Sequence, residues 1–211
     1  MASAPDLLVW IDCEMTGLDL ARDELVEVAV VITDYDLIAV DPGFEIVIRP
    51  SAAALDNMGD FVREMHASSG LLDDLADGVS LDEAQAQVLA YIAQFVPTAS
   101  SAPLAGNTIG TDRAFLNKYM PLVDAHLHYR SVDASSIKEL AKRWYPRVFF
   151  NAPSKHGGHR ALADIRESIR ELDYYRGAVF VPQPGHTSAS LQSIANAVVL
   201  AHGDIVPVSG D

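Results

Sequence analysis

The chain has 211 residues, of which 49% are hydrophobic and 21% charged, a balance that suits one globular domain and excludes an intrinsically disordered chain. It carries 15 Lys and Arg against 29 Asp and Glu, and the net charge of −14 excludes a protein that coats long nucleic acid through a broadly basic surface. Its single cysteine, Cys13, excludes a disulfide framework and a cysteine-based zinc cluster.

The N-terminal residues give no indication of a targeting segment. Residues 1–14 contain no Lys or Arg, and acidic residues interrupt their apolar stretch. Elsewhere, no apolar run approaches the ~20 residues that a membrane-spanning helix needs. We therefore expect no signal peptide, no membrane partner and a cytoplasmic location.

Five short runs of apolar and β-branched residues predict strands. The first three runs follow one another through short connections, which favours an antiparallel meander, and the last two alternate with helical segments. The predicted strands cover residues 7–11, 25–32, 44–49, 103–105 and 129–132.

Helical periodicity fills the rest of the chain up to about residue 176. Ser80 and Glu83 resemble a capping box, which predicts a helix ending before Pro97. Further helices are expected at 111–119, with Thr111 as the cap, from 135 or 136 to before Pro146, and at 160–175. Strands followed by alternating helices and strands predict an α/β fold with one mixed five-stranded sheet flanked by helices.

The composition changes after residue 177 to Pro, Gly, Ser and His, and only residues 191–201 have a helical pattern there. The expected organisation is therefore one domain over residues 1–176 and a C-terminal tail over 177–211 that is partly helical or loosely docked.

Asp12 and Glu14 lie two positions apart at the end of the first predicted strand. Because side chains alternate across a strand, both carboxylates face one side while Cys13 faces the other. Two neighbouring carboxylates repel each other unless a cation lies between them. The pair is a candidate metal site, although such acidic pairs are also common at solvated strand ends.

Three further residues can complete such a site, and two of them also have simpler explanations. Asp112 falls in the first turn of a predicted helix, where the helix dipole also stabilises a negative charge. Asp164 flanks the apolar stripe of the last predicted helix of the domain, so it needs a partner that a metal can supply. His159 follows a glycine-containing segment, where a histidine is often only a surface residue.

These five residues are more specific together than singly. Oxygen ligands without cysteine favour Mg²⁺ or Mn²⁺ over zinc. Two such ions about 4 Å apart can bind the attacking and leaving oxygens of a phosphoryl displacement. A histidine beside them is suited to take a proton from the attacking water.

The order Asp-x-Glu, Asp and His-x₄-Asp resembles the DEDDh branch of the 3′→5′ exonucleases, whose fold is ribonuclease H-like. Four longer segments are similar to the oligoribonuclease family within that branch. They are WIDCEMTGLD at residues 10–19, GNTIGTDR at 106–113, HYRSVDASSIKEL at 128–140 and HRALADIRES at 159–168. The resemblance spans about residues 7–176, so it identifies residues 1–176 as the exonuclease domain.

The resemblance implies an activity and a metal requirement. Oligoribonucleases are homodimers that hydrolyse very short RNA oligonucleotides, down to dinucleotides, to 5′-mononucleotides. By this similarity His159 is the general base. The residues that would bind two divalent cations, Mg²⁺ or Mn²⁺, are Asp12, Glu14, Asp112 and Asp164.

The resemblance also implies contacts at both ends of the substrate. Leu18 and Phe61 match positions where bases are wedged, although the family often has Trp at the position of Phe61. Tyr129 matches an aromatic residue that the partner subunit contributes. The positions matched to a cap on the 5′ phosphate are His66, Thr108, Arg130 and Ser135. The family usually has Ser at the position of Thr108, which retains the hydroxyl.

Alternatives to this interpretation make different demands on the chain. A DEDDh nuclease that trims tRNA ends or proofreads DNA binds longer strands and favours a basic track, which the net charge of −14 opposes. A catalytically silent binding module on the same fold has no use for mutually repelling acids. Phe61 and Tyr129 also have structural alternatives, as a core residue and as an edge-strand aromatic.

Overall fold

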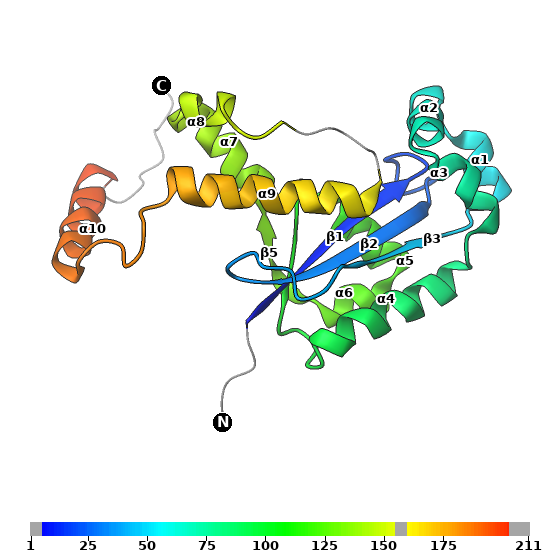
Figure 1. Cartoon of the computed structure of the whole chain (residues 1–211), viewed down its shortest axis with the longest axis horizontal. Coiled ribbons are helices and arrows are strands. Elements are labelled where there is room, and N and C mark those ends of the chain that lie inside the picture. The colour runs from blue at the N-terminus through cyan, green and yellow to red at the C-terminus, as the bar shows by residue number, and fades with distance from the viewer. Residues whose placement is uncertain (1–5, 155–159, 203–211) are drawn as a thin grey trace, which may run out of the picture.

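A mixed sheet of five strands forms the centre of the structure, a computed structural model that describes residues 6–154 and 160–202 (Figure 1). The strand order is β3-β2-β1-β4-β5. The first three strands form the predicted antiparallel meander, and β4 runs parallel to both β1 and β5. The strands are β1 (Leu7–Met15), β2 (Leu25–Asp34), β3 (Phe44–Val47), β4 (Pro103–Gly106) and β5 (His128–Asp133).

Helices cover both faces of this sheet, as the sequence predicted (Figure 1). The helices that precede β4 in the chain are α1 (Ala52–Asn57), α2 (Asp60–Ser69), α3 (Leu71–Asp74), the short 3₁₀ helix η1 (Leu75–Asp77) and α4 (Leu81–Phe95). Those after it are α5 (Gly110–Tyr119), α6 (Pro121–His126), α7 (Ala134–Trp144), α8 (Pro146–Phe150), α9 (Ala161–Val179) and α10 (Ser188–His202).

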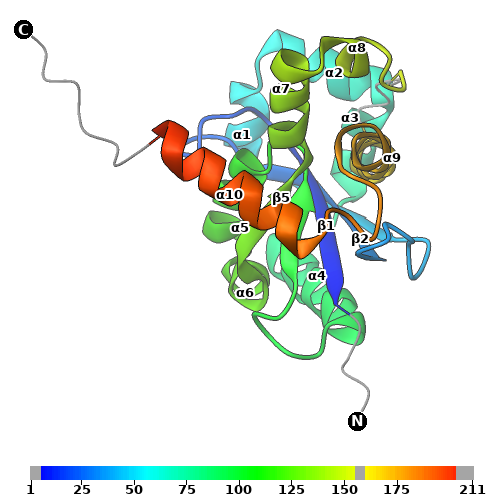
Figure 2. The same cartoon turned by 90° about the vertical axis from the view of Figure 1, so that its left-hand side faces the viewer.

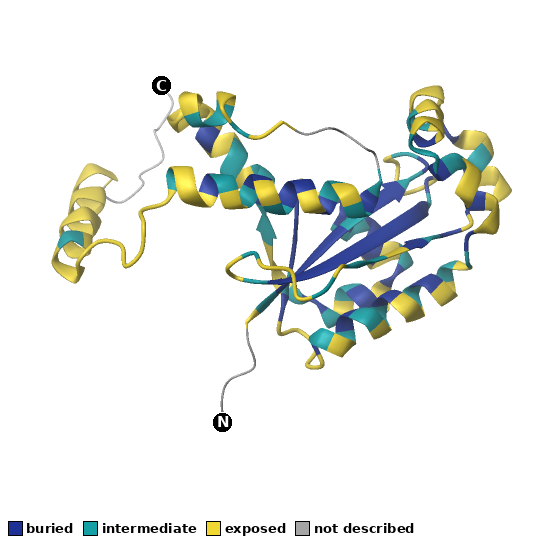
Figure 3. Ribbon diagram, viewed as in Figure 1, coloured by how far each residue is buried: buried dark blue, intermediate teal, exposed yellow. Residues whose placement is uncertain are grey.

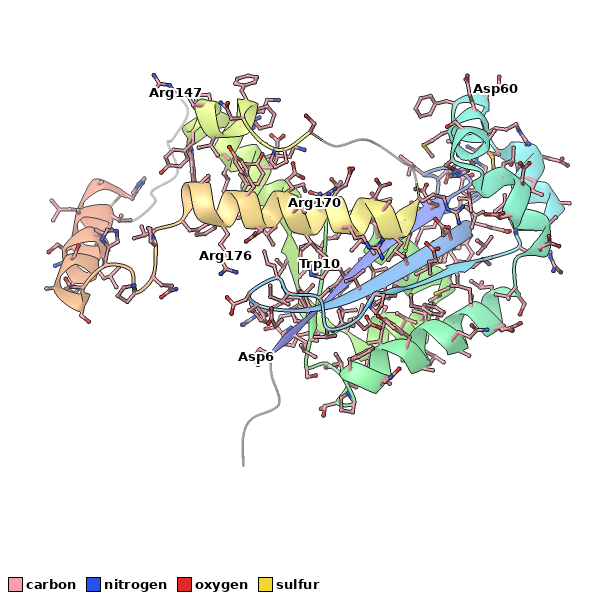
Figure 4. The ribbon with its side chains drawn as sticks, in the orientation of Figure 1. Asp6, Trp10, Asp60, Arg147, Arg170 and Arg176 are labelled. Carbon is pink, nitrogen blue, oxygen red and sulfur yellow. The ribbon has the colours of Figure 1, made fainter. Side chains whose placement is uncertain are left out.

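The alternation of side chains along β1 divides the core into two layers. Val9 and Ile11 pack with α4, α5 and α6 on one face. Leu8 and Trp10 pack with α9 on the other face, and Figure 4 shows Trp10 beneath that helix. Since side chains on a strand repeat every second residue, the later even-numbered positions of β1 also face α9.

Two helix starts differ from the sequence prediction. Ser80 accepts a hydrogen bond from Glu83 N and caps α4 as predicted. However, α5 begins one residue before Thr111, after Ile109. The cap of α7 is Asp133, whose side chain accepts from Ser135 N, because an acid at the end of β5 reaches the free amides of the next helix.

The C-terminal part departs from the predicted helix length. Helix α9 continues to Val179, so it crosses the boundary placed after residue 176. Helix α10 confirms the helical pattern at 191–201, and none of its residues is buried. In Figure 1 it lies to one side of the sheet, and in Figure 2, turned by 90°, it lies in front of it. Figure 3 shows that it is exposed along its length. No helix in the described ranges combines the length and apolarity needed to cross a membrane.

Candidate active site

Three carboxylates meet where the end of β1 faces the start of α9. Asp12 and Glu14 project from β1 on the α9 side of the sheet, and Asp164 comes from the first turn of α9. One oxygen from each of these side chains lies within 4.8 Å of the others. The structure therefore brings together residues that are about 150 positions apart in the sequence.

Asp112 reaches the same place from the first turn of α5. Its Oδ1 accepts a hydrogen bond of 3.0 Å from the backbone N–H of Cys13, the residue between Asp12 and Glu14. The side chain is buried, and it lines the same groove as the three clustered carboxylates. The hydrogen bond fixes the Asp112 carboxylate at the end of β1.

The groove around these acids has a volume of about 370 Å³. Leu18 and Thr108, both assigned from the sequence to substrate contacts, line it. Asn107 and Ser168 also line it, and Asn107 Nδ2 donates a hydrogen bond of 2.8 Å to Ser168 Oγ. Neither residue was singled out from the sequence, although Asn107 and Ser168 lie within the quoted segments.

Burial and mutual repulsion make these acids difficult to ionise. Burial, together with the nearby carboxylates, Asp112 foremost, raises the pKa of Asp12 to about 9. Burial, together with Asp164, raises the pKa of Glu14 to about 8. Burial raises the pKa of Asp112 to about 6, opposed by the hydrogen bond from Cys13. A divalent cation would relieve this repulsion, so the donor set fits Mg²⁺ or Mn²⁺.

His66 lies inside the protein and not on its surface. Its side chain is fully buried, and Nε2 donates a hydrogen bond of 2.9 Å to the carbonyl oxygen of Met15. Its Nδ1 is 3.9 Å from Glu14 Oε2. His66 therefore lies next to the carboxylate cluster, and its assignment to the 5′-phosphate cap stays a prediction.

Thr108 and Ser135 are brought together through Asp133. Thr108 N donates hydrogen bonds to Asp133 Oδ1 at 3.0 Å and to Ser135 Oγ at 3.1 Å. Ser135 Oγ in turn donates to Asp133 Oδ1 at 2.6 Å. Thr108 has a positive φ of 55°, a strained conformation that these bonds help to hold. Asp133 was not predicted as a site residue, and its place just before a helix was the available signal.

The other residues assigned to substrate or partner contacts are exposed. Leu18, Phe61 and Tyr129 have 76%, 80% and 74% of their surface accessible, far more than core residues would have. The Arg130 guanidinium lies 5.4 Å from the centre of the Tyr129 ring. Phe61 is thus not a core residue in this chain, while Tyr129 does lie on an edge strand of the sheet.

His159 lies outside the described residues. The described chain resumes at Arg160, immediately before α9, and Asp164 follows within the first turn of that helix.

Comparison with known proteins agrees with this geometry. Residues 9–172 match the family model described as Exonuclease. The chain is 67% identical over 199 residues to the oligoribonuclease of Leifsonia xyli subsp. xyli, covering 94% of this chain and 96% of that protein. It belongs to the oligoribonuclease family. A second oligoribonuclease, from Streptomyces avermitilis, is 58% identical over 195 residues, covering 92% of this chain and 98% of that protein.

The fold is shared with more distant exonucleases. Exonuclease I from Methylocaldum szegediense superposes with a TM-score of 0.61 at 18% identity, over 82% of this chain and 41% of that one. At this identity the likeness shows the fold alone, and this chain spans about two fifths of the exonuclease I chain. Family membership makes the chain a metal-dependent 3′→5′ exonuclease, a class of enzymes that acts on nucleic acid.

Proposed function

We propose that this oligoribonuclease hydrolyses very short RNA, dinucleotides above all, from the 3′ end to 5′-mononucleotides. The observation that carries the proposal is the gathering of Asp12, Glu14 and Asp164 within 4.8 Å in a groove that Asp112 also lines. Two divalent cations, Mg²⁺ or Mn²⁺, are proposed to be held by these four acids. Because the substrates are RNA fragments, the proposed location is the cytoplasm.

The chain's own residues have distinct parts in this mechanism. The carboxylates of Asp12, Glu14 and Asp164 lie close together, and the backbone N–H of Cys13 orients the carboxylate of Asp112. Divalent cations bound there would polarise the phosphoryl group and lower the pKa of the attacking water. His159 is proposed to take the proton of that water as its oxygen attacks phosphorus. The bond from phosphorus to the 3′ oxygen breaks, and that oxygen leaves with a proton as a 3′-hydroxyl.

The preference for short substrates is proposed to arise from contacts at both ends of the groove. Leu18 lines the groove and Phe61 is exposed on α2, so both are available to contact bases. Thr108 and Ser135 lie together at the start of α7, where a 5′ phosphate is proposed to be capped with the help of Arg130. His66, buried beside Glu14, is also proposed for this cap. A longer RNA would collide with such a cap. The net charge of the protein, −14, also gives little electrostatic attraction to the many phosphates of a longer RNA.

A homodimer is the proposed assembly, with Tyr129 of one subunit completing the site of the other. Tyr129 is 74% exposed on the edge strand β5, and the ring stacks on His128 with a centroid distance of 4.5 Å. An exposed aromatic residue of this kind is suited to contact a base or a second subunit.

The decisive experiment is a cleavage assay on 5′-phosphorylated RNAs of increasing length, from dinucleotides to about heptanucleotides, with Mg²⁺ or Mn²⁺ and with EDTA. The proposal predicts kcat/KM at least about tenfold higher for the dinucleotide than for the longest RNA, a difference of about 1.4 kcal/mol. It also predicts complete loss of cleavage in EDTA. Equal kcat/KM at all lengths would reject the length preference, and cleavage that persists in EDTA would reject the metal site.

A further inference from the structure

Glu27 is a buried acid beside the carboxylate cluster. It lies in β2 directly opposite Glu14 of β1, and its side chain is completely inaccessible to solvent. Residues paired across neighbouring antiparallel strands direct their side chains to the same face of the sheet, so Glu27 also faces α9. A buried carboxylate is costly unless charged or hydrogen-bonding partners compensate it.

Both oxygens of Glu27 contact donors at the start of α9. Its Oε1 accepts from Arg160 Nε at 3.0 Å and lies 2.8 Å from Arg160 Nη2. Its Oε2 accepts from the backbone N–H of Ala161 at 2.9 Å. The remaining guanidinium nitrogen, Nη1, lies 3.0 Å from Asp74 Oδ2 of α3. Arg160 is therefore held in one orientation between three elements. A guanidinium makes such contacts better than an ammonium group, because its donors are fixed in one plane.

These contacts fix where α9 begins. The residue at the N-cap position, Arg160, makes no capping hydrogen bond with its own side chain. Glu27 supplies the acceptor from β2, and its charge is also favourable at the positive end of the helix dipole. Asp164 lies in the first turn of the same helix, so the Glu27 carboxylate fixes the position of that turn relative to the sheet.

We propose that Glu27 and Arg160 are a positioning pair that sets the placement of Asp164 against Asp12 and Glu14, and thereby the affinity of the site for a divalent cation. The inference rests on the proposed function, because it takes these acids as metal ligands. Metal sites require their ligands within about 0.5 Å of the productive geometry, so a small shift of α9 is sufficient to weaken binding. In this arrangement Glu27 acts through α9 and is itself occupied by Arg160 and Ala161.

The test is a titration of the full chain with Mn²⁺ by calorimetry, with dinucleotide hydrolysis measured alongside. Glu27→Gln retains the shape of the side chain and one acceptor for Ala161 N, but it loses the forked contact with Arg160. The expected result is Mn²⁺ affinity lowered about 10- to 100-fold, as for other residues that orient metal ligands. At saturating Mn²⁺ the KM for the dinucleotide should stay within about twofold of wild type, because no substrate contact changes.

A merely structural role would give a different result. Glu27→Gln would then lower the Tm while leaving the Mn²⁺ affinity within about twofold of wild type, which would overturn the proposal. Tyr91→Phe is the matched control, because it removes a partly buried hydrogen bond of 2.5 Å to Asp41 on other elements. It should lower the Tm without changing Mn²⁺ binding. If Glu27→Gln does not fold, Arg160→Lys, which keeps the charge but loses the fork, is titrated instead with the same expected direction.

A double variant separates position from electrostatic field. Glu27→Gln together with Arg160→Gln leaves the local net charge unchanged, so a field effect alone predicts wild-type Mn²⁺ affinity. The positioning role predicts that the affinity stays about an order of magnitude low. Asp164→Asn is titrated in parallel. Undiminished Mn²⁺ binding by Asp164→Asn would reject the proposed metal site itself, whereas loss in Asp164→Asn but not in Glu27→Gln would reject only the positioning pair.

Discussion

Asp112 is the acid whose role in the fold is easiest to separate from its proposed role in metal binding. Asp112→Asn keeps an oxygen that can accept from Cys13 N, so the fold should be retained, but it removes a charge from the proposed metal site. We expect dinucleotide hydrolysis to fall at least about 100-fold, in the range of lost groups that stabilise developing charge. The measurement is kcat/KM with Mg²⁺, with the Tm as a control for folding.

Asp112→Ala extends this prediction, because it also leaves the Cys13 amide without its acceptor. A buried amide without its partner costs about 1–3 kcal/mol, so this variant should be both inactive and less stable than Asp112→Asn. Hydrolysis by either variant at the wild-type rate would contradict the assignment of Asp112 to the metal site.

His159 is expected to act in the chemical step and not in binding. His159→Ala removes the proposed general base, so kcat at pH 7 should fall by about 10²- to 10⁴-fold. Affinity for the dinucleotide and for Mn²⁺ should change little, and binding is measured on the inactive variant by calorimetry. A loss concentrated in dinucleotide affinity would instead assign His159 to substrate binding.

Most elements of the fold could be predicted because their signals are local. A short run of apolar residues predicted β1, and the alternation of side chains along a strand placed Asp12 and Glu14 on one face, where the structure has them opposite α9. Proline and the capping serine bounded α4. The apolar stripe predicted the helix that carries Asp164. The four acids were proposed together on their order and on the family resemblance, and the structure gathers them.

The features that were not predicted depend on contacts between distant segments. The contact of Glu27 with Arg160 joins residues 133 positions apart, and no local pattern reports such a pair. The burial of His66 against Met15 likewise depends on how α2 packs on the end of β1. Asp133 was missed because Ser135, an equally suitable capping residue, stands two positions later.

Helix α10 is predicted to be dispensable for the stability of the protein and for hydrolysis. We propose that residues 1–176 form the exonuclease domain and 177–211 a separable tail. Because α9 continues to Val179 and α10 has no buried residues, the informative truncation ends the chain after His186. The shortened protein should keep its Tm within about 2 °C, less than 1 kcal/mol for a chain of this size, and should hydrolyse the dinucleotide normally.

The truncation is compared with the full chain by thermal melting and by kcat/KM. A fall of more than about 5 °C, or a tenfold loss of kcat/KM, would show that the tail is part of the exonuclease fold or site.

The stability of the whole molecule should depend on pH in a way that reports the acidic cluster. The raised pKa of Asp12, about 9, and of Glu14, about 8, means that the folded state binds protons that the unfolded state has released. Stability from these groups therefore falls as pH rises from the ordinary carboxyl pKa of about 4 towards 9. In EDTA the Tm of wild type should decline over this range relative to Asp12→Asn.

Mn²⁺ should reverse this trend, because the cation binds the ionised carboxylates of the folded state and releases their protons. The Tm gained on adding Mn²⁺ should therefore grow as pH rises from about 6 to 9. Thermal melts of both proteins, with EDTA or Mn²⁺, measure the difference. If the Tm of wild type and the Tm of Asp12→Asn change with pH in parallel, the acids of the cluster do not control the pH dependence of stability.

The most direct measurement is anomalous X-ray diffraction at the manganese edge from crystals of the full chain, grown with Mn²⁺ and a diribonucleotide. The predicted map has two manganese peaks about 4 Å apart, both in contact with oxygens of Asp12, Glu14, Asp112 or Asp164. A dinucleotide bound in the groove with no manganese peak among these acids would contradict the proposed mechanism.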